Sequence, residues 1–148
     1  MINNIQDIKD IFQHHIDDFV KEFDISLIYI FGSFARETNR KNSDIDIAVL
    51  LNGKIDGYTK LNIIGRLVDI FKREDIDLVI LNNVNEVLKF QVIKHGKPIY
   101  MESQYTKVMF ESRTMSEYMD KEHFRRTQEK YSHMKFLEVM NGKIDISL

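Results

Sequence analysis

The sequence predicts an α+β fold in which short strands and amphipathic helices follow one another, ending in a helical C-terminal tail. Three short runs of mostly β-branched and other apolar residues have the composition of buried strands. The segments before and between these runs carry apolar residues three or four positions apart, which is the period of a helix. Residues 102–141 contain neither Pro nor Gly, so nothing in that stretch interrupts a helix.

The N-terminal segment, residues 5–23, is predicted to form one amphipathic helix. Its apolar side chains recur at helical spacing, and Asn3 or Asn4 is suited to cap its first turn. We expect this helix to cover one face of a sheet. The next predicted elements are strands at 26–31 and 45–51, a helix at 61–71 and a strand at 76–81. A third helix, capped by Asn83 or Asn85, runs through Val87 and Val92 and stops at Gly96. A turn with a short extended piece follows at 97–100, and a helical tail begins at 102.

Composition narrows the possible functions. The chain of 148 residues has the size of one domain and contains no cysteine, which excludes disulfides, thiolate catalysis and zinc-thiolate sites. Its formal net charge of -2 argues against a dedicated nucleic-acid surface, which is usually basic. No apolar run approaches the ~18 residues of a membrane span, and the N-terminus lacks the profile of a signal peptide. We therefore expect a cytoplasmic protein with no membrane partner.

Two aspartates at the head of the second strand are the strongest functional signal. Because strand side chains alternate between faces, Asp44 and Asp46 project from the same face, opposite Ile45 and Ile47. Two carboxylates this close repel each other unless a cation lies between them. Mg²⁺ commonly takes one or two carboxylates together with phosphate oxygens. The pair therefore predicts a metal site, although aspartates at such positions also occur as ordinary turn residues.

A Gly-Ser pair, separated from Asp44 by ten residues, predicts the phosphate-binding part of the site. Gly32 permits a tight turn close to a ligand, and Ser33 is placed to N-cap a short helix whose free amides would attract phosphate. A third carboxylate, Asp77, lies inside the apolar run 76–81, where an unpaired charge is costly. The alternative is Asp75, which has the same strand parity but lies in a charged stretch.

These residues together resemble the DNA polymerase β nucleotidyltransferase superfamily, and in particular the minimal nucleotidyltransferase (MNT) antitoxins that act beside HEPN-domain toxins. The resemblance rests on Gly-Ser, ten residues, Asp-x-Asp, and a lone carboxylate in a later strand, and it extends over residues 25–100. One departure is Glu37, where members of the family often have Gly. The resemblance implies a small mixed sheet packed against helices, with a nucleotidyltransferase domain at residues 1–101. Residues 102–148 would be a helical extension packed on this domain, on a partner, or on both.

The resemblance also implies a reaction. Two Mg²⁺ ions would be held by catalytic Asp44, Asp46 and Asp77, while Gly32, Ser33 and Arg36 would bind the nucleotide. AMP would pass from ATP to a tyrosine of a HEPN ribonuclease toxin, neutralising it within a hetero-oligomer. Two alternatives stay open: transfer to a small molecule such as an aminoglycoside, and neutralisation by binding alone. Three basic residues of the loop either contact the triphosphate or are solvated: Arg36, Arg40 and Lys41. The five histidines show no ligand spacing and are expected to be structural or surface residues: His14, His15, His95, His123 and His133.

Overall fold

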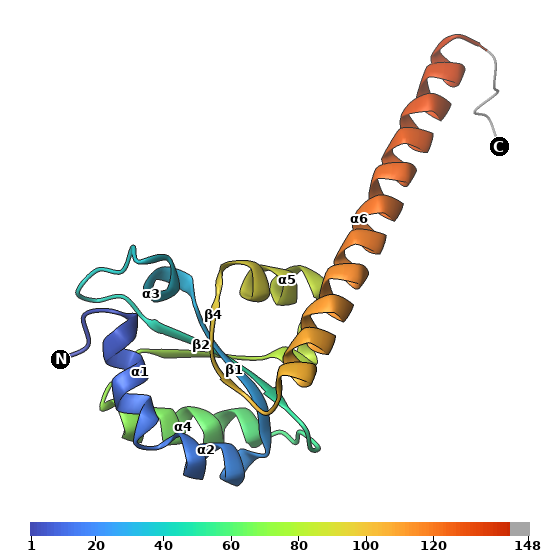
Figure 1. Cartoon of the computed structure of the whole chain (residues 1–148). Helices are drawn as coiled ribbons and strands as arrows, with labels where there is room; N and C mark the ends of the chain where they lie inside the picture. The colour runs from blue at the N-terminus through green and yellow to red at the C-terminus, as the bar shows by residue number, and fades with distance from the viewer. Residues whose placement is uncertain (143–148) are drawn as a thin grey trace.

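A computed structural model describes residues 1–142 and has the α+β fold that the sequence predicts, a four-stranded sheet between two sets of helices (Figure 1). A long helix extends from one end of this assembly. The elements are α1 (Ile5–Gln13), α2 (Ile16–Phe23), β1 (Ile25–Phe31), α3 (Gly32–Arg36), β2 (Ile45–Leu51), α4 (Thr59–Phe71), β3 (Ile76–Ile80), the 3-10 turn η1 (Leu81–Asn83), α5 (Glu86–His95), β4 (Lys97–Met101) and α6 (Gln104–Met140).

The sheet is mixed and has the strand order β3-β2-β1-β4. Strand β1 pairs antiparallel with both β2 and β4, whereas β2 and β3 run parallel. The parallel pair requires a crossover, which α4 provides. The sequence predicts only a short extended piece where β4 lies, because its partner β1 is distant in the chain. Pro98, which cannot donate to a strand ladder, is tolerated because β4 is an edge strand.

Each face of the sheet has its own apolar core. Ile45, Ile47 and Val49 of β2 pack in the cluster that contains the buried residues of α1, α2 and α4. Ala48 of the same strand packs in a second cluster with Val92 of α5. The alternation expected of β2 is therefore present, and it places Asp46 on the face of Ala48. This face carries the candidate site.

The predicted N-terminal helix is two helices, so the expectation of a single helix was wrong. The chain breaks at His14 and His15, although no Gly or Pro marks the position. Phe12 and Phe19 lie on either side of the break and both lie in the core, with their ring centroids 5.2 Å apart in an edge-on contact. Phe12 also packs edge-on against Phe71 of α4, at 5.4 Å between ring centroids. Tertiary packing thus overrides a continuous local pattern. Of the two predicted N-caps, Asn4 accepts the hydrogen bond from the amide of Asp7.

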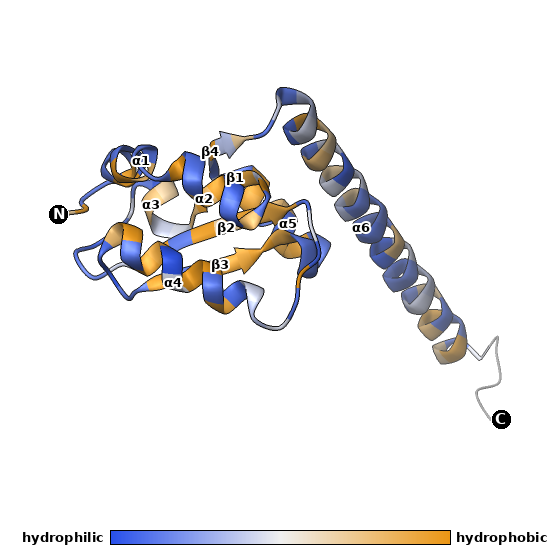
Figure 2. Ribbon diagram, turned by 90° about the horizontal axis from the view of Figure 1, so that it is seen from below, coloured by the Kyte–Doolittle hydropathy of each residue, from blue (hydrophilic) through white to orange (hydrophobic). Residues whose placement is uncertain are grey.

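The first part of α6 is attached to the domain, and the second part extends beyond it (Figure 1). The hydroxyl of buried Tyr29 donates to Glu111 over 2.9 Å. Tyr118 stacks on Phe90 of α5 with the ring centroids 4.0 Å apart. Figure 2 shows apolar bands continuing along the helix beyond these contacts. Phe124, in this part of α6, is 63% exposed. The last residues of the predicted extension, 143–148, lie outside the described residues.

Within residues 1–142, no helix combines the length and the apolar character of a membrane-spanning segment. The length of α6 alone would suffice, but its charged residues recur along the whole helix.

Candidate active site

The predicted carboxylates lie at the start of two neighbouring parallel strands. Asp46 of β2 is in register with Asp77 of β3, and Asp44 stands one residue before β2 begins. Asp46 is half-buried, whereas Asp44 and Asp77 are exposed. The apolar neighbours of Asp77 in the sequence therefore do not enclose its carboxylate, because β3 is an edge strand and that side chain points out of the core.

The raised pKa of Asp46 reflects its electrostatic interaction with the other two carboxylates. Burial raises the pKa of Asp46 from 3.8 to about 6, with further contributions from the charge of Asp77, from a hydrogen bond with Asp77, and from the charge of Asp44. Desolvation and like charges both disfavour the ionised form. The protein therefore holds Asp46 in a position where a cation would relieve the unfavourable energy.

Gly32 closes this site from the side of β1. Its φ is +67°, in the left-handed region, so the expected tight turn is present. A Cβ atom added there would lie 2.1 Å from Oδ2 of Asp46, so only glycine lets the Gly-Ser turn approach the carboxylate. This contact joins the phosphate-binding and metal-binding halves predicted from the sequence.

Ser33 does not cap the short helix, so that part of the prediction was wrong. Helix α3 begins at Gly32, its N-cap residue is Phe31, and no side chain makes a capping hydrogen bond. Because Ser33 lies inside the first turn, its hydroxyl is already past the capping position. Glu37, at the C-cap, has a φ of +60°, a conformation that glycine adopts without strain. The residue that departs from the family pattern is thus the one for which glycine would suit the backbone.

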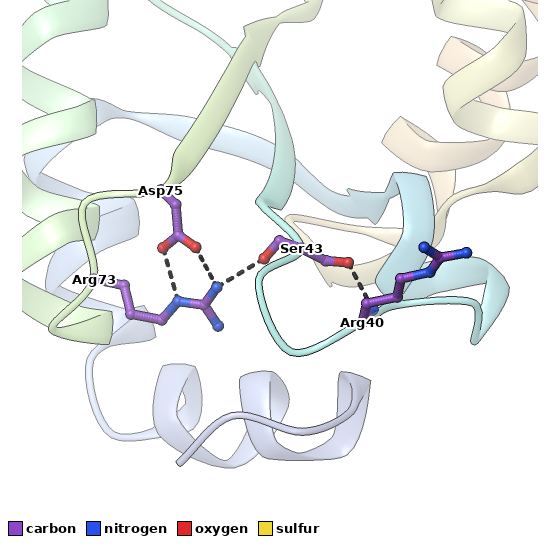
Figure 3. A network of polar contacts seen from close by, with 4 residues as sticks. All are labelled: Arg40, Ser43, Arg73 and Asp75. Carbon is purple, nitrogen blue, oxygen red and sulfur yellow. Dashed lines mark hydrogen bonds and ion pairs between the residues drawn. The ribbon is translucent and has the colours of Figure 1, made fainter.

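The two candidates for the third carboxylate have different surroundings. Asp75 forms an ion pair with Arg73, whose Nε donates to Oδ1 over 2.7 Å, and this pairing lowers the pKa of Asp75 (Figure 3). Asp77 instead faces Asp46. The geometry therefore favours Asp77 over Asp75 as the third carboxylate of the site. No pattern in the sequence indicated a role for Arg73, because one of its partners, Ser43, lies far away in the chain.

The basic loop residues and the histidines are all exposed side chains. Arg36 is exposed in the last turn of α3. Arg40 and Lys41 line a groove of about 940 Å³ that runs beside α1 and the end of α4, and none of the predicted carboxylates lines it. All five histidines are exposed, as a surface role requires: His14, His15, His95, His123 and His133.

The carboxylates suit a hard divalent cation chemically, although they do not form a closed cage. Within residues 1–142, no group of three or more Asp, Glu, His or Cys side chains is arranged to hold a metal ion by itself. Mg²⁺ usually keeps several waters and binds through one or two carboxylates plus substrate phosphates, so an incomplete protein shell is compatible with this ion. The mutual repulsion at Asp46 and the space kept open at Gly32 both fit an added cation.

The raised pKa of Asp46 predicts how the stability of the metal-free protein depends on pH. Since the folded state binds this proton more tightly than the unfolded chain, the contribution of Asp46 to stability is present below about 3.8 and is lost as pH rises through about 6. In EDTA, Asp46→Asn should therefore melt at a higher temperature than the wild type at pH 7.5, and this difference should shrink toward pH 4. Thermal melts across that range provide the measurement. A difference independent of pH would contradict the prediction.

With this geometry established, comparison with known proteins identifies the family. The family model "Polymerase beta, Nucleotidyltransferase" matches residues 6–105. The chain belongs to this nucleotidyltransferase family, and its mixed sheet with carboxylates on adjacent strands is the fold that the sequence resemblance implied.

Among individual proteins, the chain is similar to the protein adenylyltransferase MntA of Shewanella oneidensis. The two are 36% identical over 94 residues, which span 64% of this chain and 66% of the relative. A toxin-antitoxin crystallised with AMP-PNP has a TM-score of 0.67 and 30% identity over 80% of this chain and 95% of that one. The MNT antitoxin in a complex with tri-AMPylated Shewanella oneidensis HEPN toxin has a TM-score of 0.64 and 26% identity, over 84% and 98% of the two chains.

Proposed function

We propose that this protein is an antitoxin that transfers AMP from ATP to a tyrosine of a HEPN-domain ribonuclease toxin and thereby neutralises it. The observation that carries the proposal is the placement of Asp46 beside Asp77 on parallel strands, with Asp44 at the strand head and Gly32 against Asp46. Similarity to an adenylyltransferase, and to an antitoxin solved with an AMPylated HEPN toxin, supports this choice of reaction and partner. The reaction would take place in the cytoplasm, where ATP is available.

Each residue of the site has a role in this proposal. Asp44, Asp46 and Asp77 would hold two Mg²⁺ ions, which supply neutralisation of the triphosphate and a lower pKa of the acceptor hydroxyl. The Gly32 turn and the Ser33 hydroxyl would bind the phosphates, with Arg36 as a further cation. Asp77, exposed at the sheet edge, is accessible to an incoming protein and would orient the tyrosine.

The transfer itself needs no protein nucleophile. The tyrosine hydroxyl would give its proton to Asp77 as its oxygen forms a bond to the α-phosphorus. The bond from the α-phosphorus to the bridging oxygen of the β-phosphate breaks, and pyrophosphate leaves. The protein contributes positioning and electrostatic stabilisation. This agrees with the absence of cysteine from the chain.

The two alternative functions account for fewer features of the structure. Transfer to a small molecule usually needs a second binding domain, and after β4 the described residues contain only the helix α6. Neutralisation by binding alone is compatible with the exposed apolar residues of α6. A protein that acts by binding alone would not need the close approach of Gly32 to Asp46, which only glycine permits.

We further propose that the extension at residues 102–148 contributes to docking the toxin, through the part of α6 beyond its contacts with α5. Phe124 and Tyr131 are 63% and 62% exposed there, within a series of exposed apolar side chains of the kind that marks protein–protein interaction sites. The double variant Phe124→Ser, Tyr131→Ser should weaken toxin binding about tenfold or more while leaving the melting temperature almost unchanged, because neither ring is buried. Titration calorimetry with the toxin measures the affinity. Unchanged affinity would exclude this part of α6 as a docking surface.

The test of the proposed reaction uses purified components. The protein is incubated with ATP, Mg²⁺ and its cognate HEPN-domain toxin, and the toxin is then analysed by mass spectrometry. We expect mass increments of AMP on a tyrosine of the toxin. Reactions without ATP, or with Asp44→Asn, serve as controls. An unmodified toxin in the presence of wild-type protein and all components would rule out the proposed reaction.

A further inference from the structure

We infer that Arg73 is a positioning residue, which fixes the backbone that carries Asp44. Its Nε donates to Oδ1 of Asp75 over 2.7 Å, and its Nη2 donates to the other oxygen of that carboxylate. The same Nη2 donates to the backbone carbonyl of Ser43 over 2.7 Å (Figure 3). The inference rests on the proposed function, because it concerns the carboxylate site of that reaction.

Ser43 is the residue directly before Asp44, and it also closes the turn that leads to it. The amide of Arg40 donates to Oγ of Ser43 over 2.7 Å (Figure 3). The amide of Ser43 donates back to the carbonyl of Arg40 over 3.0 Å. The turn is therefore held together locally. The bond from Arg73 then sets its position relative to the sheet.

The residue after Asp44 is hydrogen-bonded to Asp75, the partner of Arg73. The amide of Ile45 donates to the carbonyl of Asp75 over 2.9 Å, where the ladder between β2 and β3 begins. Asp44 is thus flanked by two residues whose backbone is bonded to Arg73 or Asp75. Because the Asp44 side chain is exposed, side-chain packing does not hold it, and its backbone determines where its carboxylate can reach.

The guanidinium group suits this task better than a lysine would. Arginine presents several donors in one rigid plane, so it can bind a carboxylate and a carbonyl at once, whereas a lysine ammonium is a single point charge on a flexible stem. An ordinary surface ion pair contributes little to stability. If Arg73 acts through Asp44, its replacement should change metal affinity more than it changes melting temperature.

The test compares Arg73→Lys with Arg66→Lys. Arg66 lies on α4 and pairs with Glu22 at 3.1 Å, away from the carboxylates, so it is a matched control. Mn²⁺ with a non-hydrolysable ATP analogue is titrated into each variant and followed by electron paramagnetic resonance. The melting temperature is measured separately in EDTA. Removing a group that orients metal ligands typically costs about 10-fold to 100-fold in metal affinity.

We expect Arg73→Lys to weaken Mn²⁺ affinity by about tenfold or more relative to Arg66→Lys, with similar melting temperatures in EDTA. Asp75→Asn, which keeps the shape of the acceptor but removes its charge, should weaken Mn²⁺ affinity in the same direction. Equal Mn²⁺ affinity in Arg73→Lys and Arg66→Lys would overturn the inference, as would a loss of melting temperature with unchanged Mn²⁺ affinity. Wild-type protein that binds Mn²⁺ and nucleotide but leaves the toxin unmodified would instead refute the proposed function alone.

Discussion

Replacing Asp44 and Asp46 together by asparagine should abolish stabilisation by metal and nucleotide and should reduce AMP transfer at least ~100-fold. The wild type should melt at a higher temperature when Mg²⁺ and ATP analogue are added, because ligands that bind only the folded state stabilise it by mass action. The double variant keeps the size and shape of both side chains but loses the charges that would hold the cation. Differential scanning fluorimetry with and without Mg²⁺ and nucleotide measures the effect.

The same variant separates loss of the site from loss of the fold. Without metal, the double variant should be at least as stable as the wild type, because the like charges around Asp46 are removed. Asp69→Asn, an exposed position on α4, serves as the control and should respond to Mg²⁺ and nucleotide as the wild type does. Equal stabilisation of the double variant and the wild type would show that these carboxylates do not form the metal site.

The second large effect is expected for Gly32→Ala. The left-handed φ of +67° costs a residue with a Cβ atom roughly 1–2 kcal/mol. In addition, the new Cβ would lie 2.1 Å from Oδ2 of Asp46, so that the carboxylate or the turn must move. We expect unfolding free energy to fall by about 1–3 kcal/mol and transfer to be lost, since displacement of a metal ligand misplaces the ion.

Gly65→Ala is the matched control for this substitution. Gly65 lies within α4 with no atom near its added Cβ, and alanine there should stabilise the protein by up to ~1 kcal/mol. Urea unfolding of both variants, together with the transfer assay, measures the contrast. If Gly32→Ala were as stable and as active as the wild type, the close contact between the Gly-Ser turn and Asp46 would not be a requirement of the site.

The parts of the fold predicted correctly from the sequence are those encoded by local patterns. The alternation of β2 gave both the buried face and the placement of Asp46, and the boundaries of β2 agree with the prediction. Strand β4 and the break at His14 depend on contacts between distant segments. No local pattern encodes such contacts, so they appeared only in the structure.

The candidate site was predicted from the sequence to a similar extent. Asp46, Asp77 and Gly32 are brought together as their spacing and strand context indicated. The expectation that Ser33 caps α3 failed, because the helix starts at Gly32, two residues earlier than a cap at Ser33 would place it. Arg73 was not found, because its bond to the carbonyl of Ser43 is a tertiary contact.

The measurement that tests the central claim most directly is the ribonuclease activity of the HEPN toxin after it is mixed with purified Asp77→Asn protein. If AMP transfer is the neutralising event, wild-type protein with ATP and Mg²⁺ should abolish the ribonuclease activity. Asp77→Asn protein, with α6 and the apolar faces intact, should leave it almost unchanged under the same conditions. Full inhibition of the toxin by Asp77→Asn protein without nucleotide would contradict the account, because occlusion by binding would then be sufficient.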